Sequence, residues 1–146
     1  MRAILIQDRY SRGNRLIQML KKIPEIEIVM QSDKANDAAQ ICAEHRPDLL
    51  ILNTFSKDRK ALEYTGHIKQ NFPDIKILVI IGAEDNDLAR EASEAGADIV
   101  VRKIFSLDEL KQFIRYSQKH YRVFPNTGPE PQDPTQKIIP KVIRKE

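Results

Sequence analysis

Three polar residues follow apolar runs with the character of strands, and their side-chain types limit the chemistry that the chain could perform. Asp8 follows the first run, Asn53 ends the third, and Lys103 follows the fifth. In an open parallel α/β sheet, ligands and reacting groups collect at the carboxyl ends of the strands. Asp8 and Lys103 could form an ion pair there, and Asn53 could hydrogen-bond to both and hold one conformation. Because an amide cannot form an acyl phosphate, Asn53 is not a phosphoryl acceptor.

The hydrophobic pattern predicts five alternations of strand and helix. The first strand is uninterrupted by polar residues, which is typical of a strand covered on both faces. We expect strands at 3–6, 25–29, 49–52, 77–81 and 99–101, and helices at 11–23, 32–45, 58–72, 85–95 and from 106 onward. Ser11 and either Ser32 or Asp33 are candidate N-caps, and Ser106 with Glu109 has the capping-box pattern. The order (βα)5 predicts a doubly wound α/β fold, a parallel sheet with helices on both faces.

Size and composition favour a single domain with a substantial core. The chain has 146 residues, of which 41% are hydrophobic and 31% are charged. No apolar run approaches the roughly 20 residues that a membrane span needs. The first apolar run is too short for a secretory signal, so we expect a cytoplasmic protein. The single cysteine, Cys42, fits a reducing compartment and is expected either to pack as a small apolar residue or to be a reactive thiol.

The composition changes at about residue 122. The last 25 residues hold five of the eight prolines, and their five Lys/Arg and three Asp/Glu supply two of the three net positive charges. We expect a domain at 1–121 and a Pro-rich, basic, extended tail or linker at 122–146. The apolar and basic stretch 137–145 could alternatively dock as an added strand on an exposed sheet edge. The body keeps a charge of only +1, which argues against a nucleic-acid-binding face.

Several stretches resemble the receiver domains of bacterial response regulators. Residues 46–52 are similar to the run that leads to the phosphorylated aspartate of that family, with Asn53 in the place of the aspartate. Residues 94–98 resemble the Ala-Gly-Ala stretch before the last strand, and residues 72–77 resemble the lead-in to the fourth strand. The resemblance covers about residues 2–121. It implies the flavodoxin-like or CheY-like fold, with five parallel strands in the order 2-1-3-4-5.

The same resemblance implies a metal site whose ligands have changed. Receivers usually carry two adjacent acids after the first strand, which help to hold a magnesium ion beside the phosphorylated aspartate. Gln7, Asp8 and Asn53 occupy these positions. Magnesium binds through carboxylates and phosphate oxygens, so one carboxylate and two amides predict a weak, vestigial metal site. We therefore expect no cofactor.

The positions that respond to phosphorylation in related receivers have changed as well. The hydroxyl residue that closes on the phosphoryl group corresponds to Ile81, and the aromatic switch residue corresponds to Val100. The lysine is retained as Lys103. We therefore expect Asp8, Asn53, Ile81 and Lys103 to form a vestigial phosphorylation site.

These departures favour a pseudo-receiver, which is not an enzyme and acts in two-component (phosphorelay) signal transduction through phosphorylation-independent protein–protein interaction. In related receivers, the face made by the fourth helix, fifth strand and fifth helix forms dimers or contacts output domains. The residues expected on that face are Arg90, Glu94, Val100, Arg102, Asp108, Lys111 and Arg115. We expect a protein partner, an output domain or a second copy there, and neither a membrane nor a nucleic acid.

Three alternatives remain open. The chain could be the regulatory front of a longer protein, such as a partition-like pilus-assembly ATPase or a transcription factor. It could be a response regulator with non-standard phosphorylation, in which Asp8 or Asp58 takes the phosphate. It could be a flavodoxin-like cofactor binder, in which the loop 11–14 holds a cofactor phosphate. No GxxxxGK[ST] loop and no GxGxxG after the first strand is present, which argues against a P-loop ATPase or a dinucleotide site in this chain.

Overall fold

A central sheet divides the molecule into two helical layers. The computed structural model describes residues 1–7, 15–53, 60–82, 86–103, 105–118, 121–123 and 142–144. The strands are β1 (Arg2–Gln7), β2 (Glu27–Ser32), β3 (Leu49–Asn53), β4 (Lys76–Ile81), β5 (Ile99–Arg102), β6 (Tyr121–Val123) and β7 (Val142–Arg144). The helices are α1 (Arg15–Lys21), the short 3-10 helix η1 (Ala35–Asp37), α2 (Ala38–His45), α3 (Lys60–Asn71), α4 (Asn86–Ala95) and α5 (Leu107–Gln118).

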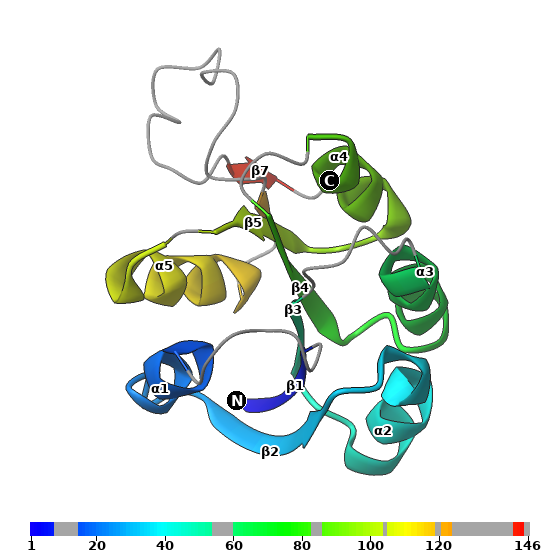
Figure 1. Ribbon diagram of the computed structural model, residues 1–146, viewed down its shortest axis with the longest axis horizontal. Coiled ribbons are helices and arrows are strands. Elements are labelled where there is room, and N and C mark those ends of the chain that lie inside the picture. The colour runs from blue at the N-terminus through cyan, green and yellow to red at the C-terminus, as the bar shows by residue number, and fades with distance from the viewer. Residues whose placement is uncertain are drawn as a thin grey trace.

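The strand order confirms the predicted doubly wound topology. Strands β1 to β5 are parallel and lie in the order β2-β1-β3-β4-β5. Helices α1 and α5 cover one face of the sheet, and α2, α3 and α4 cover the other (Figure 1). This two-sided cover explains why the central strands are nearly continuous apolar runs, since side chains on both faces of each strand are removed from water.

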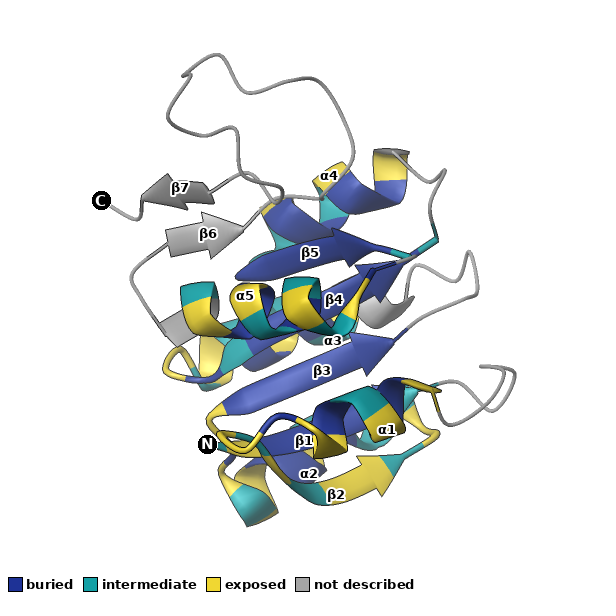
Figure 2. Ribbon diagram, turned by 90° about the vertical axis from the view of Figure 1, so that its left-hand side faces the viewer, coloured by how far each residue is buried: buried dark blue, intermediate teal, exposed yellow. Residues whose placement is uncertain are grey.

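Alternate strand residues build one apolar cluster on each face. Leu49 and Ile51 of β3 pack toward α1 and α5, and Leu50 and Leu52 pack toward α2, α3 and α4. Every residue of β3 is buried, whereas β2 is exposed along much of its length (Figure 2). The sheet is therefore anchored at its centre, and the ends of β1, β3, β4 and β5 are held in fixed register.

Strand β2 and the helical region that follows it do not begin where the sequence pattern predicts. Strand β2 begins and ends later than the predicted range 25–29, because its parallel pairing with β1 continues to Ser32. Polar, exposed residues at this sheet edge leave no apolar signal of that pairing. The Ser32 hydroxyl accepts a hydrogen bond from the Lys34 backbone N–H at 3.1 Å, and the helical region starts at Ala35 without a side-chain cap. Ser11, the other candidate N-cap, lies outside the described residues.

The capping box before α5 is confirmed in both of its hydrogen bonds. The Ser106 backbone N–H donates to Glu109 Oε1, and the Glu109 backbone N–H donates to Ser106 Oγ, each at 3.1 Å. Leu110, Phe113 and Ile114 then point into the core, as their spacing predicts. A local sequence signal therefore sets the start of this helix.

Cys42 is a packed core residue rather than an exposed reactive thiol. It lies on α2 within the cluster between that helix and the sheet and has no solvent exposure. Desolvation by burial raises the pKa of the thiol from 9.0 to about 11. The thiol is therefore protonated near neutral pH, and the nucleophilic thiolate form is scarce.

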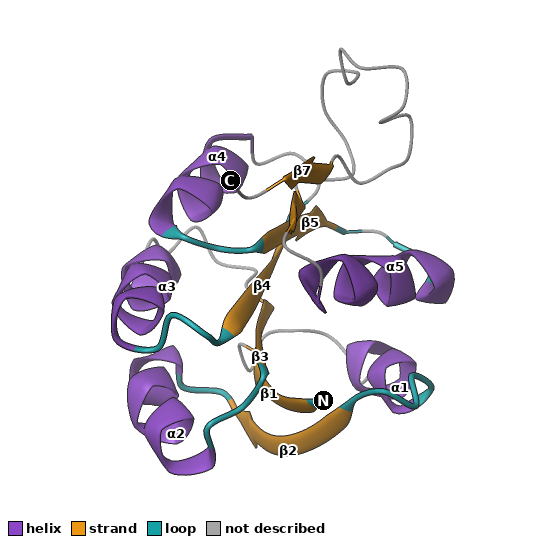
Figure 3. Ribbon diagram, turned by 180° about the vertical axis from the view of Figure 1, so that it is seen from behind, coloured by secondary structure: helices purple, strands orange, loops and turns teal. Residues whose placement is uncertain are grey.

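Two short strands continue the sheet beyond the five predicted ones. Strand β6 pairs in parallel with β5 through Val123 and Ile99, and β7 pairs antiparallel with β6. Val142–Arg144 thus adopts the added-strand alternative considered for the basic stretch near the C-terminus (Figure 3). The division of the chain into a domain at 1–121 and a tail at 122–146 stays a prediction. Within the described residues, none of the helices is both long and apolar enough to cross a membrane.

Candidate functional site at the carboxyl ends of the strands

The sheet register brings four of the predicted site residues to one end of the sheet. Gln7 lies opposite Asn53 in the β1–β3 pairing, and Asn53 lies opposite Ile80 in the β3–β4 pairing. The Lys103 backbone N–H donates to the Ile81 carbonyl oxygen at 3.0 Å, which joins the end of β5 to the end of β4. Asp8, the fifth predicted member, lies outside the described residues.

An amide pair occupies the centre of this site. Asn53 is only 6% exposed, and its Nδ2 donates a hydrogen bond to Gln7 Oε1 at 3.3 Å. Asn53 Oδ1 is also buried and accepts no hydrogen bond within the part of the chain that the structure describes. Leaving a buried acceptor unsatisfied costs about 1–3 kcal/mol. The amide pair itself is therefore uncharged, and one of its acceptors is not satisfied by its described neighbours.

The two predicted switch positions are apolar core positions. Ile81 and Val100 are both inaccessible to solvent and belong to the cluster under α2, α3 and α4. Ile81 ends β4 and carries no hydroxyl group that could donate to a bound anion. Val100 lies opposite Val79 in the β4–β5 pairing, between covered faces of the sheet. Neither side chain can reach solvent without opening the core.

The described donor set does not fit a magnesium ion. At this end of the sheet it consists of the amide oxygens of Gln7 and Asn53, whereas protein-bound magnesium is held through one or two carboxylates. Among the residues with described positions, no group of three or more His, Cys, Asp or Glu side chains could hold a metal. Asp8 could supply a single carboxylate. The described side chains alone therefore give no reason to place a divalent cation here.

The predicted partner face is narrower than the sequence indicated. Arg90 and Glu94 on α4 and Arg115 on α5 are exposed, but two other members of the predicted set are not. Val100 is completely buried, and Arg102 is 7% exposed. The assignment of these two residues to a surface was wrong, because helices cover both faces of β5.

The rest of the face is formed by the two helices. Asp108 is exposed and Lys111 is half-buried, both on α5. On α4, Arg90 forms an exposed ion pair with Asp87 at 3.3 Å, three residues earlier in the helix. Exposed pairs of this kind contribute little to stability, typically less than about 1 kcal/mol. These charged groups are therefore accessible to a partner at small cost.

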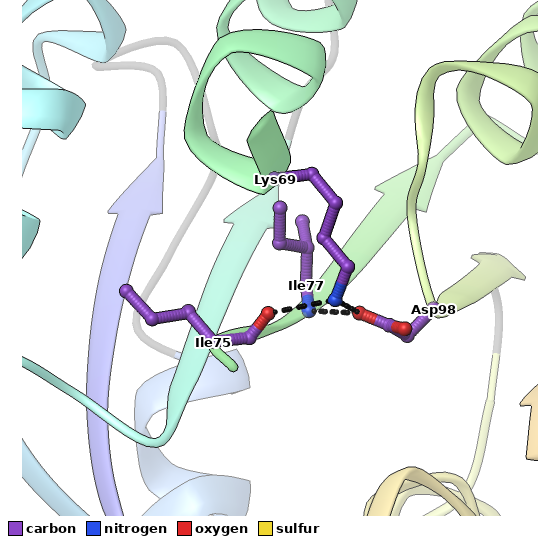
Figure 4. Close-up of polar contacts among 4 residues, drawn as sticks. All are labelled: Lys69, Ile75, Ile77 and Asp98. Carbon is purple, nitrogen blue, oxygen red and sulfur yellow. Dashed lines mark hydrogen bonds and ion pairs between the residues drawn. The ribbon is translucent and has the colours of Figure 1, made fainter. Parts of the chain in front are cut away.

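A polar network at the opposite end of the sheet was missed by sequence reasoning. Lys69 Nζ at the end of α3 lies 2.7 Å from Asp98 Oδ2 and donates to the Ile75 carbonyl oxygen at 3.0 Å (Figure 4). The same Asp98 oxygen accepts a hydrogen bond from the Ile77 backbone N–H at 2.9 Å. We call Lys69, Asp98 and these two backbone groups the amino-end network. It links α3 to the starts of β4 and β5.

Gly96 makes room for this network. Its φ angle of +116° lies where residues with a Cβ are strained, and a Cβ added there would lie 3.1 Å from Lys69 Cγ. Lys69 and Asp98 are 29 residues apart, so no local spacing could have indicated their contact. The only sequence signal was the Gly96-Ala97-Asp98 run itself, which indicates a helix end at Gly96 and the family resemblance but no contact with Lys69.

Comparison with known proteins identifies the family. The family pattern of the response regulator receiver domain matches residues 3–115. The response regulator protein VraR of Staphylococcus saprophyticus is 28% identical over 101 residues, which are 68% of this chain and 48% of VraR. The chain spans about half the length of the curated relatives that it matches.

Two solved structures share the fold. A two-component response regulator of the LuxR family from Aurantimonas superposes with a TM-score of 0.69 at 25% identity, covering 78% of this chain and 81% of the other. A DNA-binding response regulator of the LuxR family from Staphylococcus aureus gives a TM-score of 0.70 at 22% identity, covering 81% and 98%. Together with the match over residues 3–115, the strand order and register place this chain in the response regulator receiver domain family.

Proposed function

We propose that this receiver domain is a pseudo-receiver, which takes part in two-component signalling through protein contacts and does not depend on phosphorylation. The observation that carries the proposal is the Asn53 side chain. It occupies the position that the resemblance assigns to the phosphorylated aspartate. It is buried, and its amide donates a hydrogen bond to Gln7. Covalent phosphorylation needs an anionic nucleophile and neutralisation of the transferred charge. An amide pair offers no nucleophile.

The neighbouring side chains support the same reading. Ile81 cannot donate a hydrogen bond to a phosphoryl group, and Val100 is packed among apolar neighbours in the core. A switch needs an element with two arrangements of similar free energy. Apolar packing at both positions favours one arrangement, so the domain would present a constant surface. Magnesium binding would be weak or absent, because Asp8 is the single carboxylate assigned to the site.

The surface proposed for partner binding is the outer side of α4 and α5. Arg90, Glu94, Asp108, Lys111 and Arg115 give it a mixed-charge character, suited to a protein with complementary charges or to a second copy of the chain. In this proposal the domain has no catalytic activity and works in the cytoplasm.

A second candidate is that the domain regulates a longer protein. It is favoured by the lengths of the curated relatives, of which this chain covers about half. An output region would then follow the receiver, as in a transcription factor or a partition-like pilus-assembly ATPase. The two candidates share the inert site and differ in whether the partner is a separate molecule.

A spectrum with and without a phosphoryl mimic tests the inert site. Amide NMR spectra of the full chain would be recorded before and after addition of magnesium with beryllofluoride. We expect no shifts at Gln7, Asn53, Ile81 or Lys103, and no change in molecular mass by light scattering. The matched variant carries Gln7→Asp with Asn53→Asp, which returns two carboxylates beside Asp8 and should respond. Site-centred shifts or a change of association state in the unmodified chain would overturn the proposal, as would phosphate on Asp8 or Asp58 after treatment with acetyl phosphate.

A further inference from the structure

The edge of the sheet beyond β5 is completed by the chain's own C-terminal segment. The backbone of β7 runs antiparallel to β6, with Tyr121 opposite Arg144, Arg122 opposite Ile143 and Val123 opposite Val142. Strand β6 lies in turn against β5 and α5. The hydrogen-bonding edge of β6 that faces away from β5 is therefore taken by β7.

The pairing between β6 and β7 is short and therefore weakly stabilised. Each strand has only three residues, and eighteen residues, 124–141, separate them in the chain. Hairpin connections usually have two to five residues, and a connection of that length helps to fix the pairing. Strands usually have about five to six residues, so a pairing of three residues forms few backbone hydrogen bonds. The register of β7 on β6 must therefore be held by the strand pairing itself, and its loss would leave the five central strands intact.

We propose that the outer edge of β6 is a strand-addition site for a protein partner, and that β7 occupies this site until the partner displaces it. The partner would supply an extended segment that resembles β7. In β7 two β-branched residues, Val142 and Ile143, have a basic residue on each side. Main-chain hydrogen bonds would provide most of the affinity, as in other cases of strand addition. The proposal holds whether or not Asn53 prevents phosphorylation, because the edge lies apart from that site.

The composition of β7 explains why addition would occur at β6 and not beyond β7. Lys141, Arg144 and Lys145 lie within or beside a strand of three residues, and Pro140 precedes them. Short edge strands bearing lysine and proline resist pairing with further strands. Strand β7 therefore fills the edge of β6 and is the outermost strand among the described residues, so a partner strand that pairs with β6 must replace β7.

The site can be opened without removing any part of the chain. Ile143→Pro in the full chain removes a backbone N–H from the middle of β7 and disfavours its pairing. Ile143→Thr keeps the N–H and the β-branched shape and is the matched control. The probe is a fluorescent synthetic peptide of residues 137–146, which has the sequence of the resident strand. Binding would be followed by anisotropy, and its location by amide NMR shifts.

The expected result is competition between the peptide and the chain's own β7. If β7 occupies the site in most molecules, the peptide can bind only to the small open fraction, and its apparent affinity is lower in proportion to that fraction. The Ile143→Pro variant should therefore bind the peptide at least about tenfold more tightly than either the unmodified chain or the Ile143→Thr variant. Shifts should centre on the amides of β6. Equal affinity for all three proteins, or no binding to any of them, would overturn the proposal.

Hydrogen exchange gives a readout that does not depend on the peptide. In Ile143→Pro, those amides of Tyr121–Val123 that face β7 should exchange at least about tenfold faster, while those of β1 and β3 are unchanged. Unchanged exchange in β6 would overturn the proposal. So would a concentration-dependent dimer of the unmodified chain that Ile143→Pro abolishes, since β7 would then fill the edge of a second copy. None of these readouts involves phosphate, so their failure would leave the proposed pseudo-receiver function untouched.

Discussion

The two ends of the sheet contain polar groups of different kinds. At the amino ends of β4 and β5, Asp98 is 2% exposed, and its carboxylate is neutralised by Lys69 and bonded to a backbone N–H. At the carboxyl ends, Asn53 is buried to a similar extent, but it makes one side-chain contact with Gln7 and leaves Oδ1 without a donor among its described neighbours. At the amino end an ion pair compensates a buried charge, whereas at the carboxyl end the side-chain hydrogen bond between neighbouring strands joins two amides.

This contrast separates two uses of buried polar groups. The amino-end network ties α3, β4 and β5 together, so its role in the fold is sufficient to explain the charged residues. The amide pair ties only neighbouring strands that already share backbone hydrogen bonds. In a site for phosphoryl transfer, carboxylates would have to be held together at a cost in stability. If the domain does not transfer phosphate, as proposed, it need not hold several carboxylates together at the expense of stability.

The largest effect is expected from removing the charge of Asp98. Asp98→Asn keeps the shape but leaves Lys69 Nζ facing a neutral amide in a partly closed site. Loss of one partner from a buried ion pair typically destabilises by 3–5 kcal/mol. Because Lys69 is 19% exposed and can be partly hydrated, we expect a decrease of about 3 kcal/mol in the free energy of unfolding, measured by urea denaturation.

Glu94→Gln provides the matched control for that measurement. It makes the same chemical change at an exposed position on α4. We expect a change within about 0.5 kcal/mol, the usual range for exposed substitutions. Similar losses in both variants would mean that the amino-end network does not carry the stability assigned to it.

Gly96 tests whether the network depends on its backbone. Gly96→Ala would strain a φ angle of +116° and press a methyl group against the Lys69 side chain, which two hydrogen bonds hold in place. We expect a loss of about 2 kcal/mol in unfolding free energy.

The control for Gly96 is Gly66→Ala in α3, where the added Cβ would lie an acceptable 3.6 Å from the Ala95 carbonyl oxygen. Alanine is favoured over glycine inside a helix by about 0.5–1 kcal/mol, so this variant should be stabilised. A lower unfolding free energy for Gly96→Ala and a higher one for Gly66→Ala would show that the backbone at Gly96 matters specifically for the amino-end network. Destabilisation of both to the same extent would attribute the Gly96 effect to general crowding.

The smallest change in unfolding free energy is expected from a substitution at the carboxyl ends of the strands. Asn53→Leu loses a hydrogen bond that contributes about 1 kcal/mol but also removes a buried acceptor whose desolvation costs about 1–3 kcal/mol. These contributions oppose each other, so the free energy of unfolding should change by less than about 1 kcal/mol. A loss as large as that of Asp98→Asn would break the comparison, because it would show that the amide pair stabilises the fold as much as the ion pair.

Sequence patterns predicted the elements whose signals are local. The apolar run before Asn53 predicted β3, and the Ser106–Glu109 pattern predicted the start of α5, because the apolar pattern of a strand and the capping of a helix are both written in a few consecutive residues. The position of Asn53 at a strand end followed from the same run. Strand β2 lies later in the chain than its apolar pattern predicts, because its last residues pair through the backbone while their side chains stay largely exposed.

The sequence by itself determined the alternation of strands and helices, the receiver resemblance, and the amide and aliphatic side chains at the site positions. Only the tertiary structure decided that Arg102 is buried, that Lys69 meets Asp98, and that Val142–Arg144 joins the sheet. The physical reason is distance along the chain. Periodicity and capping depend on neighbours within a helical turn or a strand, whereas burial and ion pairing depend on residues that become neighbours only when the chain folds.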